Sequence, residues 1–281
     1  MRRLVLVLGA GGQLGEVMAD RLARHHEVIA HTRADLDITD APALQDAIGT
    51  VCPDVVVNCA AYTNVDDAER HPVPALAVNA LALRTLTRAV AAIDATLVHF
   101  STDFVVDGTI DRVHTEADQP LPRGNYAISK LLGEWFAAEA PRHYVLRVES
   151  LFGGPRAKSS VDKLLDGIVA GREVRAFRDR TVSPSYVEDV TMATAALLER
   201  GAPYGLYHCV NTGWTTWSAL ARELAALLDV PDARIVDVPM ADAQLLAPRP
   251  QFAALSNAKL TAAGVTMPTW QDALRRYVKV S

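Results

Sequence analysis

The feature that most constrains this 281-residue chain is a turn with regularly spaced glycines near its start. Leu4–Leu8 is a continuous apolar run, as expected of a parallel strand that is buried on both faces. Gly9, Gly12 and Gly15 follow three residues apart, and a helical pattern comes next. This order favours a dinucleotide-binding loop over an ordinary turn, because it brings backbone and a helix N-terminus close to a pyrophosphate.

The alternation of strand and helix patterns in the first half of the chain predicts an α/β fold. Four further apolar runs alternate with helical patterns, which is typical of a Rossmann doubly wound parallel sheet. These runs cover residues 27–31, 54–62, 96–103 and 142–148. After residues 153–155 the alternation gives way to helices and short strands. We therefore expect a dinucleotide-binding Rossmann core at 1–150. Residues 151–281 are expected to form mainly a smaller α+β substrate-binding lobe, packed on the core, with some segments returning to it.

Composition narrows the class of protein further. The net charge of −5 and the lack of a basic stripe argue against nucleic-acid binding. Cys52, Cys59 and Cys209 are odd in number and widely spaced, so they predict neither disulfides nor a metal site. The first apolar run is too short for a signal peptide, and no window approaches the roughly 18 apolar residues of a membrane span. We expect a cytoplasmic protein with no membrane partner and no metal.

The end of the second predicted strand bears on the choice of cofactor. In a Rossmann unit this point meets the adenosine ribose, where an acidic residue accepts the 2′-hydroxyl and an arginine accommodates a 2′-phosphate. Here the strand ends in His31-Thr32-Arg33. Arg33 therefore favours NADPH, with NADH possible, and the alternative is a solvated loop arginine. Asp37 and Ile38 follow and are candidates to flank the adenine.

Two further stretches are candidates to approach the cofactor. Cys59-Ala60-Ala61-Tyr62 ends the third predicted strand in small residues, which let backbone approach a ligand closely. Asn79 lies inside a long helical pattern, where asparagine is an indifferent helix former. It either faces the cofactor or sits on a solvated face.

Three residues with polar side chains are candidates for catalysis. Thr102 closes the fourth predicted strand, at the edge of an open parallel sheet where ligands bind. Tyr126 and Lys130 lie four apart, so in a helix they share a face. A neighbouring ammonium lowers the pKa of a phenol, which suits a tyrosine that exchanges protons with a carbonyl or alcohol. The alternative is a helical tyrosine packed over a lysine stem.

Together these residues resemble the extended short-chain dehydrogenase/reductase superfamily and, within it, the dTDP-4-dehydrorhamnose reductases. The resemblance spans nearly the whole chain and rests on several short motifs in order. They are Gly12-Gln13-Leu14-Gly15, Asp54-Val55-Val56-Val57-Asn58, Ser101-Thr102-Asp103-Phe104-Val105, Tyr126-x-x-x-Lys130, Gly205-Leu206-Tyr207-His208 and Arg249-Pro250.

The resemblance implies a role for each matching residue. Tyr126 would protonate the developing oxyanion, Lys130 would tune the tyrosine and bind the nicotinamide ribose, and Thr102 would orient the carbonyl. The implied cofactor-binding residues are Gly9, Gly11, Gly12, Gln13, Leu14, Arg33, Asp37, Ile38, Cys59, Ala60, Ala61, Tyr62, Asn79, Tyr126 and Lys130. The implied substrate-binding residues are Thr102, Asp103, Phe104, Val105, Glu149 and Arg249.

The implied reaction is NADPH-dependent reduction of the C4 keto group of a nucleotide-linked 6-deoxy-hexose, with dTDP as the expected nucleotide. Sugar-nucleotide 4,6-dehydratases usually carry two acidic residues directly after the active-site threonine. Here Asp103 is followed by Phe104, so the second acid is missing and dehydration is disfavoured. One alternative is a ketoreductase for another nucleotide sugar. Another is a non-catalytic dinucleotide-binding subunit like the regulatory subunit of methionine adenosyltransferase, although Thr102, Tyr126 and Lys130 favour an enzyme. We expect a monomer or homodimer.

The chain departs from this family's pattern around the expected sugar. Phe104 replaces a tyrosine, and residues 147–152 differ from the family's usual Arg-Thr-Ser-Trp. Residues 178–185 differ from the family's Asp-Gln-x-Gly-x-Pro-Thr segment and keep only the proline and a hydroxyl partner. Glu149 either meets a sugar hydroxyl or pairs with a neighbour such as Arg147. The family's metal-linked acid aligns with Val17, so no metal is expected.

Overall fold

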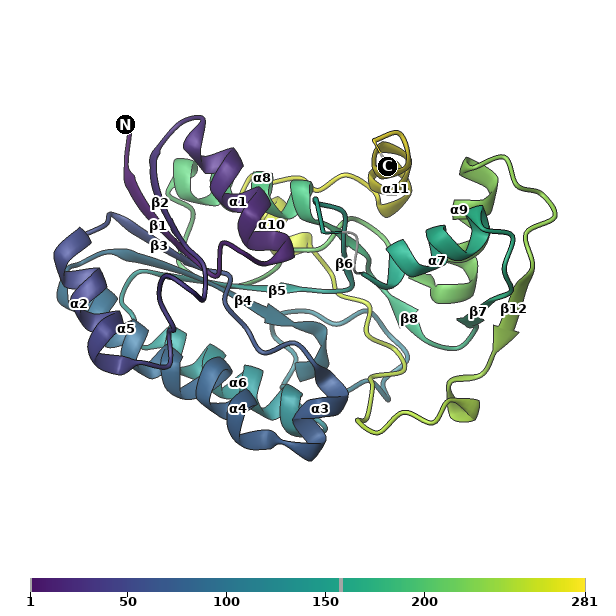
Figure 1. Ribbon diagram of the computed structural model, residues 1–281, viewed down its shortest axis with the longest axis horizontal. Coiled ribbons are helices and arrows are strands. Elements are labelled where there is room, and N and C mark those ends of the chain that lie inside the picture. The colour runs from purple at the N-terminus through teal and green to yellow at the C-terminus, as the bar shows by residue number, and fades with distance from the viewer. Residues whose placement is uncertain (1, 157–158, 281) are drawn as a thin grey trace.

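The computed structural model describes residues 2–156 and 159–280 and is built on a six-stranded sheet (Figure 1). Every neighbouring pair is parallel, in the order β10-β5-β4-β3-β1-β2. The strands are β1 Leu4–Leu8, β2 Glu27–His31, β3 Val55–Asn58, β4 Thr96–Thr102, β5 His143–Val148 and β10 Gly205–His208. The predicted doubly wound parallel sheet is confirmed.

The sheet is covered on both faces, as the apolar strands require. Val5 and Val7 of β1 face one hydrophobic core, while Leu6 and Leu8 face another, because successive side chains of a strand point to opposite faces. One layer contains α2 Ala41–Val51, α3 Val65–Arg70, α4 Pro72–Leu76, η1 Ala77–Leu81, α5 Ala82–Ala92 and α6 Asn125–Ala138. The other contains α1 Gln13–Ala23, α8 Val187–Arg200 and α10 Ala258–Ala262.

The strand order reverses at β1, which pairs with β2 on one side and β3 on the other. Leu8 lies beside both His31 and Asn58, so the carboxyl ends of the three strands are level. Ligands of open parallel sheets bind at such a reversal. The fold therefore places a crevice at the end of β1, where the glycine turn begins.

The second half of the chain adds a lobe of short elements and also returns to the sheet. Three two-stranded pairs are formed by β6 Leu151–Phe152 with β9 Ser185–Tyr186, β7 Val174–Phe177 with β12 Ile235–Val238, and β8 Thr181–Val182 with β11 Thr215–Thr216. The remaining elements are α7 Ser160–Val169, α9 Trp217–Leu227, α11 Trp270–Val278, η2 Asp103–Val105 and η3 Met240–Asp242. Figure 1 shows β7, β12, α7 and α9 at the far right, away from β1 and β2. By contrast, β10 forms an edge of the main sheet and α8 packs on α1.

One expectation about membranes needs correction. The continuous helix Pro72–Ala92 is long and apolar enough to span a membrane by length and composition, and 44% of its most apolar window is buried. Its side chains at Leu83 and Leu86 belong to the core beneath the sheet. The apolar character of this helix is thus explained by packing against β-strands and neighbouring helices.

Candidate active site

The glycine turn after β1 forms a close-packed cradle. Gly9 has a φ of +73°, and a Cβ there would lie 2.5 Å from the Ala60 backbone nitrogen. A Cβ on Gly15 would lie 2.2 Å from the Gly9 carbonyl oxygen. Gly12 N-caps α1 without a side-chain hydrogen bond, so the first amide groups of α1 are available to an anion. These contacts fit a bound pyrophosphate.

A cavity of about 410 Å³ opens beside this turn. It is lined by Gly9, Gly11, Gly12, Thr32, Arg33, Ala34, Leu36, Asp37, Ile38, Cys59, Ala60, Ala61, Tyr62 and Val78. Most of the residues that the sequence associates with a cofactor therefore meet in one place. Thr32, Ala34, Leu36 and Val78 complete the wall and were not predicted, because small and apolar residues in a loop or in η1 carry no distinctive signal.

The end of β2 is a compact turn in which Arg33 is exposed. Asp35 accepts hydrogen bonds from the backbone nitrogen and hydroxyl of Thr32, at 2.8 and 2.7 Å. Arg33 has 86% of its side chain exposed and pairs with Asp37 at 3.4 Å. Hydrogen bonds from Thr39 hold the pKa of Asp37 below its usual value, so this carboxylate stays charged. Arg33 is thus free to meet a ligand at the cavity edge.

Five predicted cofactor residues do not line this cavity, and two of them, Tyr126 and Lys130, lie at the end of β4 and are described below. Leu14 is buried in the core, and the Gln13 side chain donates to the Gly153 carbonyl oxygen at 2.9 Å. Asn79 is 1% exposed on η1, a π-helical turn. Its side chain exchanges two hydrogen bonds with the Tyr62 backbone and donates to Ser129 Oγ at 3.0 Å. Asn79 therefore links the cavity wall to α6 and is not on a solvated face.

Thr102, Tyr126 and Lys130 come together at the end of β4. All three are buried, with Thr102 at 6%, Tyr126 at 8% and Lys130 at 2% exposure. The Lys130 ammonium donates to the Phe100 carbonyl oxygen at 2.6 Å, which fixes α6 against β4. The Thr102 hydroxyl donates to Asp103 at 2.9 Å and accepts from the Phe104 backbone nitrogen at 3.2 Å.

Burial dominates the protonation of this group. It raises the pKa of Tyr126, which the Asp103 carboxylate raises further and a hydrogen bond with Thr102 lowers. Burial also lowers the pKa of Lys130 to about 8, against the opposing effect of Glu134. The raised tyrosine pKa is opposite to the direction expected from the Tyr–Lys pair alone. Tyr126 is consequently a neutral phenol at pH 7, with a proton to donate.

Two buried carboxyl groups lie behind Thr102. Asp103 is 2% and Glu149 1% exposed, and burial raises the pKa of both, more strongly for Glu149, which also faces the Asp103 carboxylate. Arg180 approaches Asp103 at 4.0 Å, and Glu149 accepts from the Ser183 backbone nitrogen at 2.7 Å. Among the described residues, Asp103 Oδ2 and Glu149 Oε1 have no hydrogen-bond donor. Arg147 pairs with Glu134 and not with Glu149, so the expected alternative of a Glu149–Arg147 ion pair is wrong.

A second, smaller cavity of about 170 Å³ lies on the far side of Phe104. The Phe104 ring meets Tyr126 edge-on at 5.4 Å, and the Arg180 guanidinium lies 5.6 Å from its centre. Arg249 lines this cavity and is held by two hydrogen bonds to Asp66, at 2.7 and 2.8 Å. Val105 is fully buried in a separate apolar cluster, so its side chain faces away. Arg123 also lines this cavity. It was not predicted, and Arg180 was noted only as part of the departing segment 178–185, because single arginines in irregular segments have no pattern.

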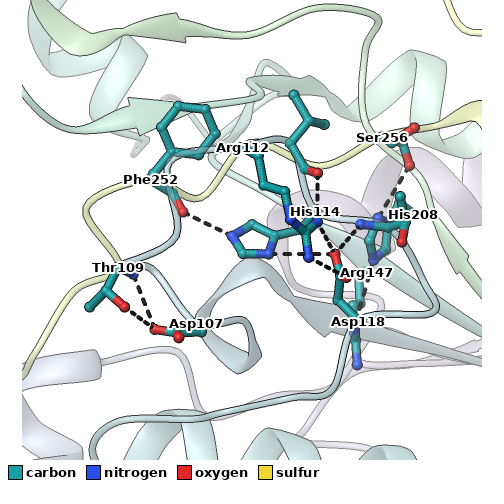
Figure 2. Close-up of polar contacts among 11 residues, drawn as sticks. Asp107, Thr109, Arg112, His114, Asp118, Arg147, His208, Phe252 and Ser256 are labelled. Carbon is teal, nitrogen blue, oxygen red and sulfur yellow. Dashed lines mark hydrogen bonds and ion pairs between the residues drawn. The ribbon is translucent and has the colours of Figure 1, made fainter.

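A polar network holds the segment after β4, part of which lines this second cavity (Figure 2). Arg112 pairs with both carboxylate oxygens of Asp118, at 2.8 and 2.7 Å. His114 lies 3.2 Å from the Phe252 carbonyl oxygen, and His208 lies 3.2 Å from that of Ser256. Figure 2 shows these groups joining the segment to the chain near its C-terminal end. Hydrogen bonds thus connect the two loops that line the cavity.

The comparisons with known proteins agree with this architecture. The family model described as the RmlD substrate binding domain matches residues 1–281. A dTDP-4-dehydrorhamnose reductase of Mycobacterium tuberculosis is 36% identical over 278 residues, covering 96% of this chain and 90% of the relative. A probable dTDP-4,6-dihydroxy-2-methyloxan-3-one 4-ketoreductase of Streptomyces antibioticus is 33% identical, covering 96% and 92%. The crystal structure of dTDP-4-dehydrorhamnose reductase from Bacillus anthracis, in complex with NADP, has a TM-score of 0.95, 28% identity and full coverage of both chains.

Fold, site and relatives together define a Rossmann-fold oxidoreductase. More specifically, the chain belongs to the RmlD substrate-binding-domain family. The predicted resemblance to dTDP-4-dehydrorhamnose reductases is confirmed.

Proposed function

We propose that this protein reduces the C4 keto group of a dTDP-linked 6-deoxy-hexose, with NADPH as the cofactor. The observation that carries the proposal is the meeting of Thr102, Tyr126 and Lys130 at the end of β4. Tyr126 packs against Tyr62 of the glycine-lined cavity and against Phe104 of the Arg249 cavity. The names of the relatives at 33–36% identity support the substrate class, and the NADP complex of the Bacillus anthracis structure supports the cofactor.

The cofactor would be held by residues that already have a suitable arrangement. The Gly9–Gly12 turn and the first amides of α1 would bind its pyrophosphate, and Arg33 the 2′-phosphate. Ile38 and Ala60 are placed to enclose the adenine half. When bound, the cofactor supplies the hydride, and the protein contributes binding, orientation and electrostatics.

The protein's own residues account for the proton. Tyr126 is buried and neutral at pH 7, so it holds a proton where an oxyanion would develop. Thr102 offers a hydroxyl beside it to orient the carbonyl. Lys130, anchored on Phe100, keeps a positive charge within the same buried group and favours negative charge on the oxygen.

The test of this function is a reaction followed by absorbance of the reduced nicotinamide. Purified protein is mixed with NADPH and dTDP-4-keto-6-deoxy-hexoses, and we expect substrate-dependent oxidation of NADPH. Tyr126→Phe should lower turnover by about 100-fold or more, the range for loss of a general acid, while NADPH binding stays near wild type. Tyr204→Phe, at a half-exposed tyrosine away from the site, is the control. Full activity of Tyr126→Phe would contradict the assignment of the proton donor.

A second candidate substrate follows from the walls of the sugar side. The Streptomyces antibioticus relative is named for a different dTDP-linked keto sugar. In this chain, Phe104, Glu149 and Arg180 replace or add to the groups expected near the sugar. The assay therefore includes a panel of dTDP-keto sugars. Binding of NADPH without reduction of any of them would favour the non-catalytic binding subunit.

A further inference from the structure

The loop after β6 packs directly on the start of α1. Gln13 donates to the Gly153 carbonyl oxygen at 2.9 Å, and a Cβ on Gly154 would lie 3.3 Å from the Gln13 carbonyl oxygen. This loop belongs to the second half of the chain, yet it borders the proposed pyrophosphate site. The side chain two residues after Gly154 lies beside Gly11 of the cofactor cavity.

Arg156 is that side chain. Its Nε donates to Glu16 in the first turn of α1, at 3.1 Å. Its Nη2 lies 4.0 Å from the position that a Cβ on Gly11 would occupy, and the same position is 3.4 Å from Thr32 Cγ2. The guanidinium therefore reaches the gap between the glycine turn and the end of β2. Gly11 and Thr32 both line the cofactor cavity.

Arg33 approaches the same region from β2. Both arginines are exposed and paired with carboxylates, Arg33 with Asp37 at 3.4 Å and Arg156 with Glu16 at 3.1 Å. Exposed pairs of this kind are weak, so either guanidinium can exchange its carboxylate for a stronger anion. A phosphate monoester carries about two negative charges at pH 7, and a planar guanidinium binds it with two parallel hydrogen bonds.

We propose that Arg156 is a second binding residue for the 2′-phosphate of NADPH and that, with Arg33, it sets the preference for NADPH over NADH. The inference rests on the proposed use of a nicotinamide dinucleotide and adds a residue from the substrate-binding half of the chain. Gly11 leaves room for the phosphate in this arrangement, because a side chain there would occupy the gap between Arg156 and Thr32.

The test measures binding, so it does not depend on turnover. Wild type and Arg156→Ala are titrated calorimetrically with NADPH, with NADH, and with adenosine 2′,5′-bisphosphate against 5′-AMP. We expect Arg156→Ala to weaken NADPH and the bisphosphate roughly tenfold, the usual scale for a charge-assisted hydrogen bond, and to change NADH and AMP less than twofold. The rise in melting temperature on adding NADPH should shrink accordingly.

Two variants act as controls. Arg172→Ala removes an exposed arginine of the same lobe and should change none of the affinities. Glu16→Gln removes the partner of Arg156 but keeps the arginine, so NADPH should bind at least as tightly as to wild type.

Three outcomes would overturn the inference. Equal weakening of NADPH and NADH by Arg156→Ala would place the guanidinium at the pyrophosphate. No weakening would leave it as a partner of Glu16 alone, and a loss in Glu16→Gln as large as in Arg156→Ala would show that only the ion pair matters. Failure of the proposed function has a separate readout: the wild-type protein would bind neither cofactor, or it would reduce none of the keto sugars.

Discussion

Glu149 shows how a single residue sets a pH dependence. It is 1% exposed, burial and the Asp103 carboxylate raise its pKa well above the usual value, and Arg180 and the Ser183 amide oppose this only in part. Between the unfolded value near pH 4.3 and the raised folded value, the folded protein keeps this group protonated, whereas the unfolded chain has released the proton. The folded state then binds more protons, so this group's contribution to stability is greatest below that pH and falls as pH rises.

Glu149→Gln is therefore expected to stabilise the protein at neutral and alkaline pH. Glutamine mimics the protonated acid and can still accept from the Ser183 amide. We expect a gain of at least about 1 kcal/mol at pH 8, the equivalent of one pKa unit, and almost none at pH 4. Urea denaturation across this range measures it, with exposed Glu139→Gln as the control. A variant less stable than wild type at every pH would show that Glu149 is ionised and paired with Arg180.

The sequence predicted which residues meet at this site, but it did not predict how burial shifts their pKa values. Tyr126 and Lys130 are one helical turn apart, which the spacing alone indicates, and Thr102 ends a strand. The pKa of Tyr126, however, is raised by burial, and burial depends on elements far away in the chain. Arg180, which lies over Phe104 from the other half, was missed for the same reason.

At the scale of elements, the contact between α6 and η1 positions the helix that carries Tyr126 and Lys130. A Cβ on Gly133 would lie 2.2 Å from the Asn79 carbonyl oxygen, so α6 can approach η1 this closely only with glycine there. Asn79 in turn binds Tyr62 and Ser129. The π-helical turn therefore joins the cofactor cavity to the helix that carries Tyr126. The sequence predicted one long helix here, and nothing in its periodicity indicated the π-helical turn.

Gly133→Ala should consequently disturb both stability and activity. The new methyl group meets backbone, which cannot rotate away, so we expect a loss of about 1–3 kcal/mol and a fall in turnover as α6 shifts. Gly49→Ala is the matched control, because Gly49 lies within α2 and a Cβ there has no neighbour within 4 Å. It should stabilise the protein by about 0.5–1 kcal/mol, as expected for alanine within a helix. Similar effects of the two substitutions in thermal denaturation would contradict the close α6–η1 contact.

At the scale of the whole molecule, the proposed nucleotide and sugar sides of the site come from different parts of the chain. The alternating strands and helices predicted the sheet and its crevice, because each unit is defined by local pattern. The walls of the second cavity come from residues 104, 106, 108, 109, 123, 240 and 248–251, which have no shared pattern and meet only through the fold. That is why the sequence indicated Phe104 and Arg249 there by family resemblance and not by spacing.

The ion pair between Asp66 and Arg249 joins these parts across 183 residues of chain. It involves two hydrogen bonds at 2.7 and 2.8 Å, and Asp66 also accepts from the Ala247 backbone nitrogen. The bonds to Arg249 lower the pKa of Asp66 to about 2. Because the folded pKa is depressed, the stabilisation is complete above the unfolded value near 3.9 and is lost as pH falls towards 2.

Asp66→Asn is therefore expected to destabilise the protein by about 1 kcal/mol at pH 7, a figure reduced for the 41% exposure of the Asp66 side chain. The difference from wild type should stay constant from pH 7 to 5 and shrink below pH 4. Urea denaturation at intervals from pH 7 to 3 follows this change, and Asp20→Asn, at an exposed helical pair, should show no comparable loss. The Michaelis constant for the sugar nucleotide should also rise, because Arg249 loses the carboxylate that holds it in the cavity wall. A stability difference that persisted unchanged to pH 3 would mean that packing around residue 66, and not the ion pair, joins the two halves.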